Sequence, residues 1–224
     1  HRLLMDEPFF AALSRRMDKR ATNAIPTAGV TVTEEGKLQM VYNPKFFAPL
    51  SDDARKDILK HEFYHIVFQH VTGGRFLSFR DMAPNERKIH NIAMDLAING
   101  HLPNLPEGAC FPGKGPFAHL EPFKSAEHYL RELRKMQKDE PEGEGKGEGG
   151  GEGGEGGEGQ PGGGQGQGNP LDGMDSFDDH SGWDEMDDQT KQIAEERVKE
   201  FIKDAVEEAN SSNRGWGSVP ADCR

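Results

Sequence analysis

The residues with the clearest chemical meaning are two histidines and a glutamate in the stretch His61-Glu62-Phe63-Tyr64-His65. Residues four positions apart lie on the same face of an α-helix, so His61 and His65 can present two imidazoles to one metal ion. Glu62 is offset by one position and can reach a water molecule on that ion. This spacing is the H-E-x-x-H signature of zinc hydrolases, in which the glutamate is the general base. We therefore predict that His61 and His65 bind Zn²⁺ and that Glu62 is catalytic.

Two histidines on an exposed surface helix would show the same spacing without binding a metal. The surrounding sequence argues against that interpretation, because apolar residues such as Ile58 and Ile66 lie on both sides of the pair and predict a buried helix. This helix is expected to begin at Ser51, whose hydroxyl can cap free amides, with Asp52 in its first turn. We expect it to continue until Gly73-Gly74 breaks it.

A catalytic zinc site needs a third protein ligand and leaves its fourth position open. His90 and Asp95 both fall on a second predicted helix, over residues 86–99. Five positions on a helix correspond to a rotation of about 140°, so only one of the two can face the metal. We favour Asp95, because Asn91 and Asn99 lie one turn to either side of it and extend a polar stripe on an otherwise apolar helix. Such an amide can hold a ligating histidine. A solvated polar face, or His90 as the ligand, are the alternatives.

A further histidine, His70, follows the motif closely. It is nine residues after His61 and five after His65, which would place it on the far side of an unbroken helix. The glycine that turns the chain after this motif in metzincins is absent. We therefore do not expect His70 to bind the metal.

The remaining elements predict an α+β fold, mostly helical, with a small hairpin or sheet beside the motif helix. Alternating, β-rich stretches at residues 28–33 and 37–42 indicate the hairpin. Apolar residues at helical spacing indicate further helices near residues 8–17, 126–138 and 193–206. We divide the chain into a metallopeptidase-like domain at 1–138, a linker and acidic segment at 139–188, and an amphipathic helix and tail at 189–224 that packs on the domain.

The net charge of −12 comes from one part of the chain. Residues 139–188 hold 16 acidic residues and one basic residue, and most of 141–170 is glycine and glutamate. Such a segment has no packing side chains, so we expect a flexible, extended linker. An acidic arm that docks a partner or sequesters metal is the alternative. The basic residues elsewhere are scattered, which argues against a nucleic-acid-binding surface.

Two further patterns bear on the cellular setting. No run of about 18 apolar residues is present, so no membrane span is predicted. Cys110 and Cys223 lie far apart, and neither belongs to a C-x-x-C pair. We therefore expect a reducing compartment, the cytoplasm.

Several stretches resemble a family described as metallopeptidases, often followed by a von Willebrand A-like domain and accompanied by an AAA-type ATPase. The matching stretches, which cover most of residues 8–220, are Val41-Tyr42-Asn43-Pro44, the motif His61 to His65 with His70 beyond it, Asn91 to Asn99, Ser125-Ala126-Glu127-His128-Tyr129 and Asp179-His180-Ser181-Gly182-Trp183. The resemblance implies a zincin-like fold in which the hairpin flanks the site, His61 and His65 bind zinc and Glu62 is the base.

The pair Asp95 and Asn99 also resembles a variant of the gluzincin arrangement, where a ligating glutamate is followed four residues later by an aspartate that orients a histidine. Here Asp95 is one methylene shorter than the ligating glutamate, and Asn99 carries one charge fewer than the aspartate. The von Willebrand-like domain is not in this sequence, which ends at Arg224 about where that domain would begin. We expect either a fragment or a form that lacks it.

Taken together, the residues predict zinc-dependent hydrolysis of peptide bonds in a peptide or protein substrate. The alternative is a zinc-stabilised scaffold or adaptor that works with an AAA-type ATPase or a von Willebrand A-like partner and presents its acidic arm and residues 178–183. A third possibility is that His180 or nearby aspartates fold back over the zinc and inhibit it. Four residues are unranked candidates for stabilising an oxyanion, namely Tyr64, His101, His119 and Tyr129.

Overall fold

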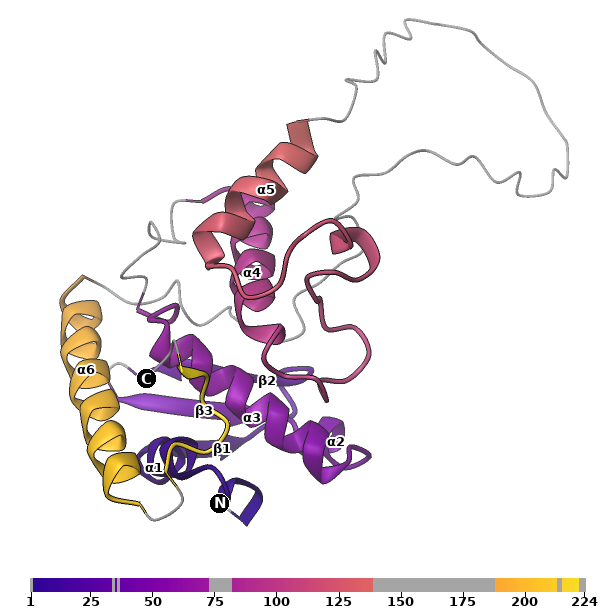
Figure 1. Ribbon diagram of the computed structural model, residues 1–224. Coiled ribbons are helices and arrows are strands. Elements are labelled where there is room, and N and C mark those ends of the chain that lie inside the picture. Colours follow the sequence, from indigo (N-terminus) through magenta and orange to yellow (C-terminus); the bar gives the residue numbers. More distant parts are fainter. Residues whose placement is uncertain are drawn as a thin grey trace, which may run out of the picture.

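The computed structural model describes residues 2–33, 35, 37–72, 82–138, 188–212 and 215–221 (Figure 1). The strands are β1 (Asp18–Ala21), β2 (Ala28–Val32) and β3 (Leu38–Tyr42). The helices are α1 (Pro8–Arg16), α2 (Pro44–Phe47), α3 (Asp52–Val67), α4 (Pro84–Asn99), α5 (Ala126–Lys138) and α6 (Asp188–Ser211), with short 3-10 helices η1 (Arg2–Leu4) and η3 (Gly115–Phe117). This arrangement confirms the predicted α+β class, mostly helical with a small sheet.

Some predictions concern residues that the structure does not describe. Apart from Asp188, the predicted linker lies outside the described residues, as do His180 and the segment 178–183. Among the helices that are described, none is both long enough and apolar enough to cross a lipid bilayer.

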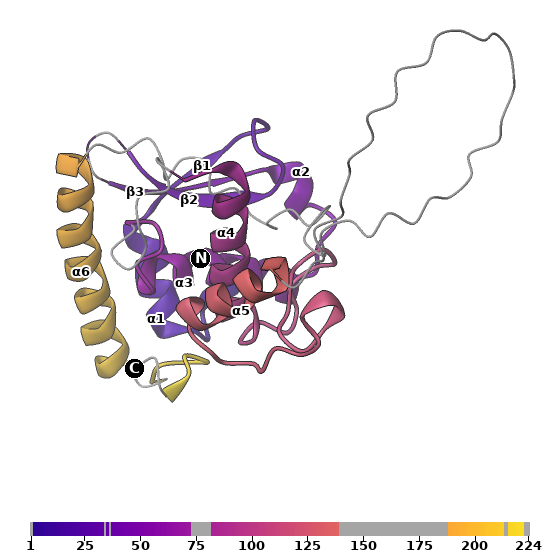
Figure 2. The ribbon, with the colours of Figure 1, turned by 90° about the horizontal axis from the view of Figure 1, so that it is seen from above.

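The three strands form one sheet in the order β1-β3-β2. β2 and β3 pair antiparallel, with Val30 opposite Met40, which confirms the predicted hairpin. β1 adds to the other side of β3 in parallel and was not predicted; its side chains are all exposed and show no alternation. Seen from above, α1 and α3 lie on the same face of the sheet (Figure 2). The sheet thus supports the motif helix α3, which packs against β2.

Aromatic side chains join α1 to α3 in the core. The Phe10 ring of α1 lies 5.2 Å from the Tyr64 ring and 6.3 Å from the Phe63 ring, and all three side chains are buried. Contacts of this kind add about 0.5–1.5 kcal/mol each to the stabilisation from buried area. They fix the position of α3 along the stretch that carries the H-E-x-x-H motif.

The C-terminal part of the described chain returns to the N-terminal part. α6 runs beside α1 (Figure 1). Its Glu208 forms ion pairs with both Arg15 and Arg16. Residues 215–219, which we call the C-terminal strap, then cross the start of α1. Trp216 of the strap stacks on Phe9, with the ring centroids 5.5 Å apart.

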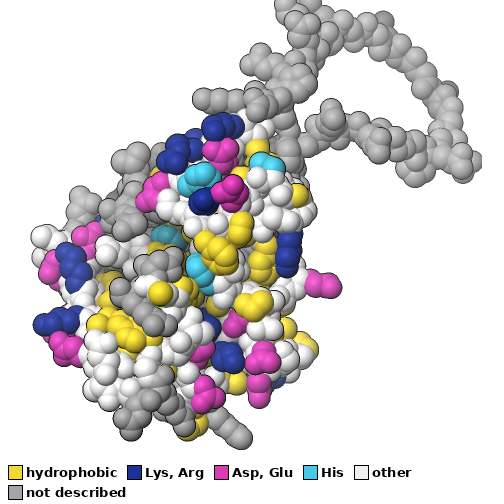
Figure 3. All heavy atoms as spheres, viewed as in Figure 1, with side chains coloured by type: hydrophobic (Ala, Val, Ile, Leu, Met, Phe, Trp, Pro, Cys, Tyr) yellow, Lys and Arg dark blue, Asp and Glu magenta, His cyan; other side chains and the backbone are white. Residues whose placement is uncertain are grey.

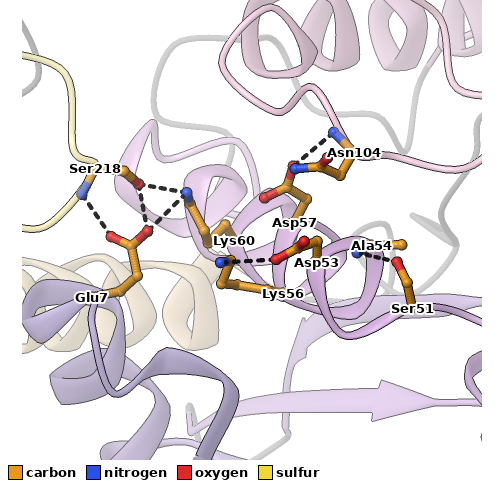
Figure 4. Close-up of polar contacts among 9 residues, drawn as sticks. All are labelled: Glu7, Ser51, Asp53, Ala54, Lys56, Asp57, Lys60, Asn104 and Ser218. Atoms are coloured by element: carbon orange, nitrogen blue, oxygen red, sulfur yellow. Dashed lines mark hydrogen bonds and ion pairs between the residues drawn. The ribbon is translucent and has the colours of Figure 1, made fainter.

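A buried polar cluster anchors the strap to α3 (Figure 4). The Ser218 backbone N–H donates to Glu7 Oε2 and its hydroxyl donates to Glu7 Oε1, each at 2.7 Å. Lys60 Nζ lies 3.3 Å from Glu7 Oε1, and the Lys60 and Glu7 side chains are only 6% and 8% exposed. A buried charge that loses its partner costs several kcal/mol, so this cluster resists rearrangement. Lys60 directly precedes His61, so the strap is tied to the motif helix at the motif itself.

The strap makes a sharp stability prediction at Gly217. Its φ is +66°, and a Cβ there would lie 2.9 Å from Glu7 Cα and 3.1 Å from the Asp6 carbonyl oxygen. We expect Gly217→Ala to lower the free energy of unfolding by more than the roughly 1–2 kcal/mol that the left-handed backbone alone costs an alanine. Gly215→Ala is the matched control, because Gly215 has a similar φ of +65° and open space around it. Urea unfolding of both variants checks this, and equal losses would contradict the close contact.

Candidate metal centre

The helix α3 carries the motif and begins where the sequence predicts. The Ser51 hydroxyl accepts a hydrogen bond from the Ala54 N–H at 3.2 Å, and Asp52 and Asp53 occupy the first turn (Figure 4). The Ser51 hydroxyl satisfies a free amide at the start of the helix, and the two aspartates interact favourably with the positive end of the helix dipole. One turn later, Asp57 accepts hydrogen bonds from the backbone and side-chain amides of Asn104, which ties α3 to the segment after α4.

The structure brings three of the predicted ligands together. His61 Nε2 and His65 Nε2 lie 3.0 Å apart, and Asp95 Oδ1 of α4 lies 3.7 Å from the first and 3.5 Å from the second. All three side chains are completely buried. Their ligand atoms lie within 4.8 Å of one another, a grouping that can hold a metal ion.

The separations fit a tetrahedral ion of the size of zinc. A Zn²⁺ ion about 2.1 Å from each ligand atom holds those atoms about 3.4 Å apart, within about 0.4 Å of every separation found here. Two imidazole nitrogens and one carboxylate oxygen are also a donor set used by catalytic zinc sites, which keep a fourth position for water or substrate. The residues present therefore fit the metal that the sequence pattern implies.

Asn99 fixes the ring of His61. The Asn99 amide donates from Nδ2 to the Cys110 carbonyl oxygen at 2.8 Å, which turns its Oδ1 toward His61 Nδ1, also at 2.8 Å. An amide oxygen only accepts, so the proton of the neutral His61 ring must sit on Nδ1. Nε2 therefore keeps its lone pair and faces His65 and Asp95, as a metal ligand must.

Two further residues of α4 that the sequence pattern singles out are His90 and Asn91. His90, the alternative third ligand, is buried on α4 and donates from Nδ1 to the Glu86 carbonyl oxygen at 2.8 Å. Among the described residues, the group that could hold a metal ion is His61, His65 and Asp95, and it does not include His90. Asn91 is half-buried, and its Oδ1 is enclosed without accepting a hydrogen bond from any described residue. The predicted role of Asn91 in holding a ligating histidine stays a prediction.

Glu62 lies between the two histidines in the sequence, and its side chain is completely buried. On a helix it lies about 100° around from His61 and about 60° from His65, because it precedes His65 by three residues. Its carboxylate is therefore carried on the edge of the face that presents the two imidazoles. A side chain carried there can approach a water molecule on an ion held by the two imidazoles.

His70, which helical spacing separates from the metal site, lies beside His65 in the structure. α3 ends at Val67, earlier than the predicted break at Gly73, and the turn that follows brings His70 Nδ1 to 3.0 Å from His65 Nδ1. His70 is only 3% exposed. The expectation that it lies on the far side of the helix is therefore wrong, because that expectation assumed an unbroken helix.

Tyr129, one of the four oxyanion candidates, has a structural role in this fold. Its hydroxyl donates to the Glu121 carbonyl oxygen at 2.8 Å and accepts from the Lys124 N–H at 3.3 Å. Burial raises the pKa of the Tyr129 phenol, so the hydroxyl keeps the proton that it donates. Both bonds bracket Phe123, whose φ of +61° is unusual for a residue other than glycine.

Tyr64 and His101, two further oxyanion candidates, belong to an aromatic row that leads to the surface. The Tyr64 ring lies 6.0 Å from the His101 ring, which lies 4.9 Å from the Phe123 ring. Phe123 is 60% exposed. In the space-filling view, hydrophobic side chains gather near the middle of the face seen in Figure 1, with charged side chains around them (Figure 3). The last candidate, His119, is exposed.

Comparison with known proteins adds one finding. Neither the curated proteins nor the solved structures contain a significant match to the chain. A family model described as "Putative metallopeptidase domain" matches residues 1–223, which include α3, α4 and the C-terminal strap. The chain therefore belongs to this metallopeptidase family.

Proposed function

We propose that the chain is a zinc-dependent peptidase that hydrolyses peptide bonds with Glu62 as its general base. The observation that carries the proposal is the buried group of His61, His65 and Asp95, with ligand atoms 3.0–3.7 Å apart on the two facing helices. Membership of a metallopeptidase family supports the same conclusion. The AAA-type ATPase and the von Willebrand A-like partner that the resemblance implies remain predictions.

Each residue of the site has a distinct part in this proposal. His61, His65 and Asp95 would hold the ion, and Asn99 keeps the His61 ring in the orientation and tautomer that ligation needs. When bound, Zn²⁺ would polarise the substrate carbonyl and make a water molecule more acidic. Complete burial of the three ligand side chains strengthens every electrostatic interaction among them.

Glu62 would carry the proton through the reaction. Its carboxylate takes a proton from the attacking water and delivers it to the amine that leaves when the peptide bond breaks. A carboxylate suits this exchange because it accepts and returns one proton without a change in position. Glu62 is not needed as a ligand, since the two histidines and Asp95 already provide three ligand atoms.

The proposal is tested by metal content and peptidase activity measured on the same preparation. We expect about one zinc ion per chain, hydrolysis of some members of a broad peptide panel, and loss of that activity on treatment with a chelator. Added Zn²⁺ should restore the activity. A chain that binds zinc fully but cleaves no peptide would instead support the zinc-stabilised scaffold, and a chain that binds no zinc would exclude both.

A further inference from the structure

The end of α3 has a geometry that reverses the chain directly after the motif. The His70 N–H donates to the His65 carbonyl oxygen at 2.8 Å, and the Gln69 N–H donates to the Ile66 carbonyl oxygen at 2.9 Å. Gln69 has a φ of +59°. This pair of bonds around a left-handed residue is the Schellman motif, in which glycine is the usual occupant of the left-handed position.

The reversal has a direct consequence for the site. The backbone bond holds His70 beside the last turn of α3, so its side chain returns toward His65 instead of continuing around the helix. The two Nδ1 atoms then lie 3.0 Å apart, and both rings are buried. One of these nitrogens must donate and the other must accept, since two lone pairs at this separation would repel.

The direction of this hydrogen bond follows from the opposite edge of the His65 ring. His65 Nε2 faces His61 Nε2 and Asp95 Oδ1, so a His65 that ligates a metal carries its lone pair there. The proton of a neutral ring then sits on Nδ1 and is donated to His70 Nδ1. His70 is the acceptor, and its own proton sits on Nε2.

We propose that His70 is the positioning residue of the metal ligand His65, holding its ring and its Nδ1–H tautomer from the Schellman turn that ends α3. This inference rests on the proposed metal site. His70 does for His65 what Asn99 does for His61, but the two acceptors come from different elements. Each ligating ring is thus oriented independently, one by the helix α4 and one by the end of the motif helix itself.

The test compares two substitutions at His70. His70→Phe keeps a ring of similar size and removes the acceptor, whereas His70→Asn keeps an amide oxygen close to the place of Nδ1. Loss of an outer-shell partner weakens metal binding about 10- to 100-fold. We expect that loss for His70→Phe in competition between the protein and a zinc chelator. We expect His70→Asn to stay within about threefold of the unsubstituted chain by the same reasoning.

A matched control separates positioning from packing. His90→Phe also removes a buried histidine and its hydrogen bond, that to the Glu86 carbonyl oxygen, but His90 is not one of the three grouped ligands. It should lower the free energy of unfolding without weakening zinc binding. Nitrogen-15 NMR of the histidine rings in the zinc-loaded protein gives a second readout. His65 should be the Nδ1–H tautomer in the unsubstituted chain and lose that preference in His70→Phe.

The outcomes separate this inference from the proposed function. If the unsubstituted chain does not bind zinc, the proposed function fails. If it binds zinc and His70→Phe binds as tightly, or if His70→Asn is as weak as His70→Phe, the positioning role is overturned. If His70→Phe does not fold, His70→Gln replaces it, because its amide reaches the place of Nε2 and not that of Nδ1. Tight binding by His70→Gln would then overturn the inference.

Discussion

Glu62→Gln is expected to lower kcat/KM for peptide hydrolysis by about 10²- to 10⁴-fold, the usual contribution of a general base. That loss corresponds to about 2.7–5.5 kcal/mol of transition-state stabilisation. Glutamine has nearly the shape of glutamate, so the buried site should keep its packing. Its amide cannot accept the proton of the attacking water, and this single chemical difference removes the reaction path.

The same variant should keep its metal, because Glu62 is not one of the three ligands. We expect zinc affinity within about threefold of the unsubstituted chain, far from the effect of losing a ligand. Peptide cleavage and zinc titration on one preparation measure the two quantities together. Glu7→Gln is the control, since Glu7 is also a buried glutamate and directly precedes α1. Per folded molecule it should retain activity, and a Glu62→Gln enzyme as fast as the unsubstituted one would exclude Glu62 as the base.

Local sequence patterns indicate the helices that carry the proposed metal ligands. Ser51 and the acidic first turn indicated the start of α3, and apolar spacing indicated α4. Four-residue spacing indicated His61 and His65, and the polar stripe favoured Asp95 over His90; the structure brings these three side chains together, because both helices are regular where they lie. Rules that depend on helical periodicity succeed wherever the helix continues.

His70 was misplaced because its position depends on where the helix ends. Periodicity does not show that α3 stops at Val67, and the left-handed position that reverses the chain is occupied by Gln69 instead of the glycine that usually marks it. The short turn after α3 therefore determines that His70 lies beside His65. The next glycine signal, at Gly73, was further along the chain.

Two other features depend on partners distant in sequence. β1 is exposed on all four residues and forms only because β3 offers an edge, so no local alternation indicates it. The C-terminal strap reaches Glu7 across more than two hundred residues, and its Gly217 is explained only by the close approach of Glu7. Burial against a distant element is a tertiary property that residue patterns do not contain.

Asn99 shows how a departure from a known pattern can be explained by structure. Asn99 stands where the gluzincin arrangement has an aspartate, which would place one more negative charge in the site. The Nδ2 group of Asn99 donates to the Cys110 carbonyl oxygen, a bond that an ionised carboxylate could not make. An aspartate there would set a carboxylate oxygen against a carbonyl oxygen in a buried setting. The amide therefore suits both of its neighbours, His61 and Cys110.

Asp95→Ala is expected to weaken zinc binding by more than about 100-fold, beyond the 10- to 100-fold effect of an outer-shell residue. A loss of that size corresponds to more than about 2.7 kcal/mol of binding free energy. Asp95 supplies the one negatively charged atom of the three, and it does so in a fully buried site where charge interactions are strong. Competition with a chelator of known affinity measures the loss, and peptidase activity should fall with zinc occupancy.

Two controls make the assignment of Asp95 specific. Asp57→Ala removes another buried aspartate, one that accepts hydrogen bonds from Asn104, and should lower stability while zinc binding is retained. His90→Ala removes the alternative ligand and should also retain zinc. Asp95→Asn keeps an oxygen in place and loses the charge, so its affinity should lie between those of Asp95→Ala and the unsubstituted chain. If zinc binding is lost in His90→Ala and kept in Asp95→Ala, the third ligand is His90 and not Asp95. The Asp95 carboxylate would then lie beside the two imidazoles without binding the ion.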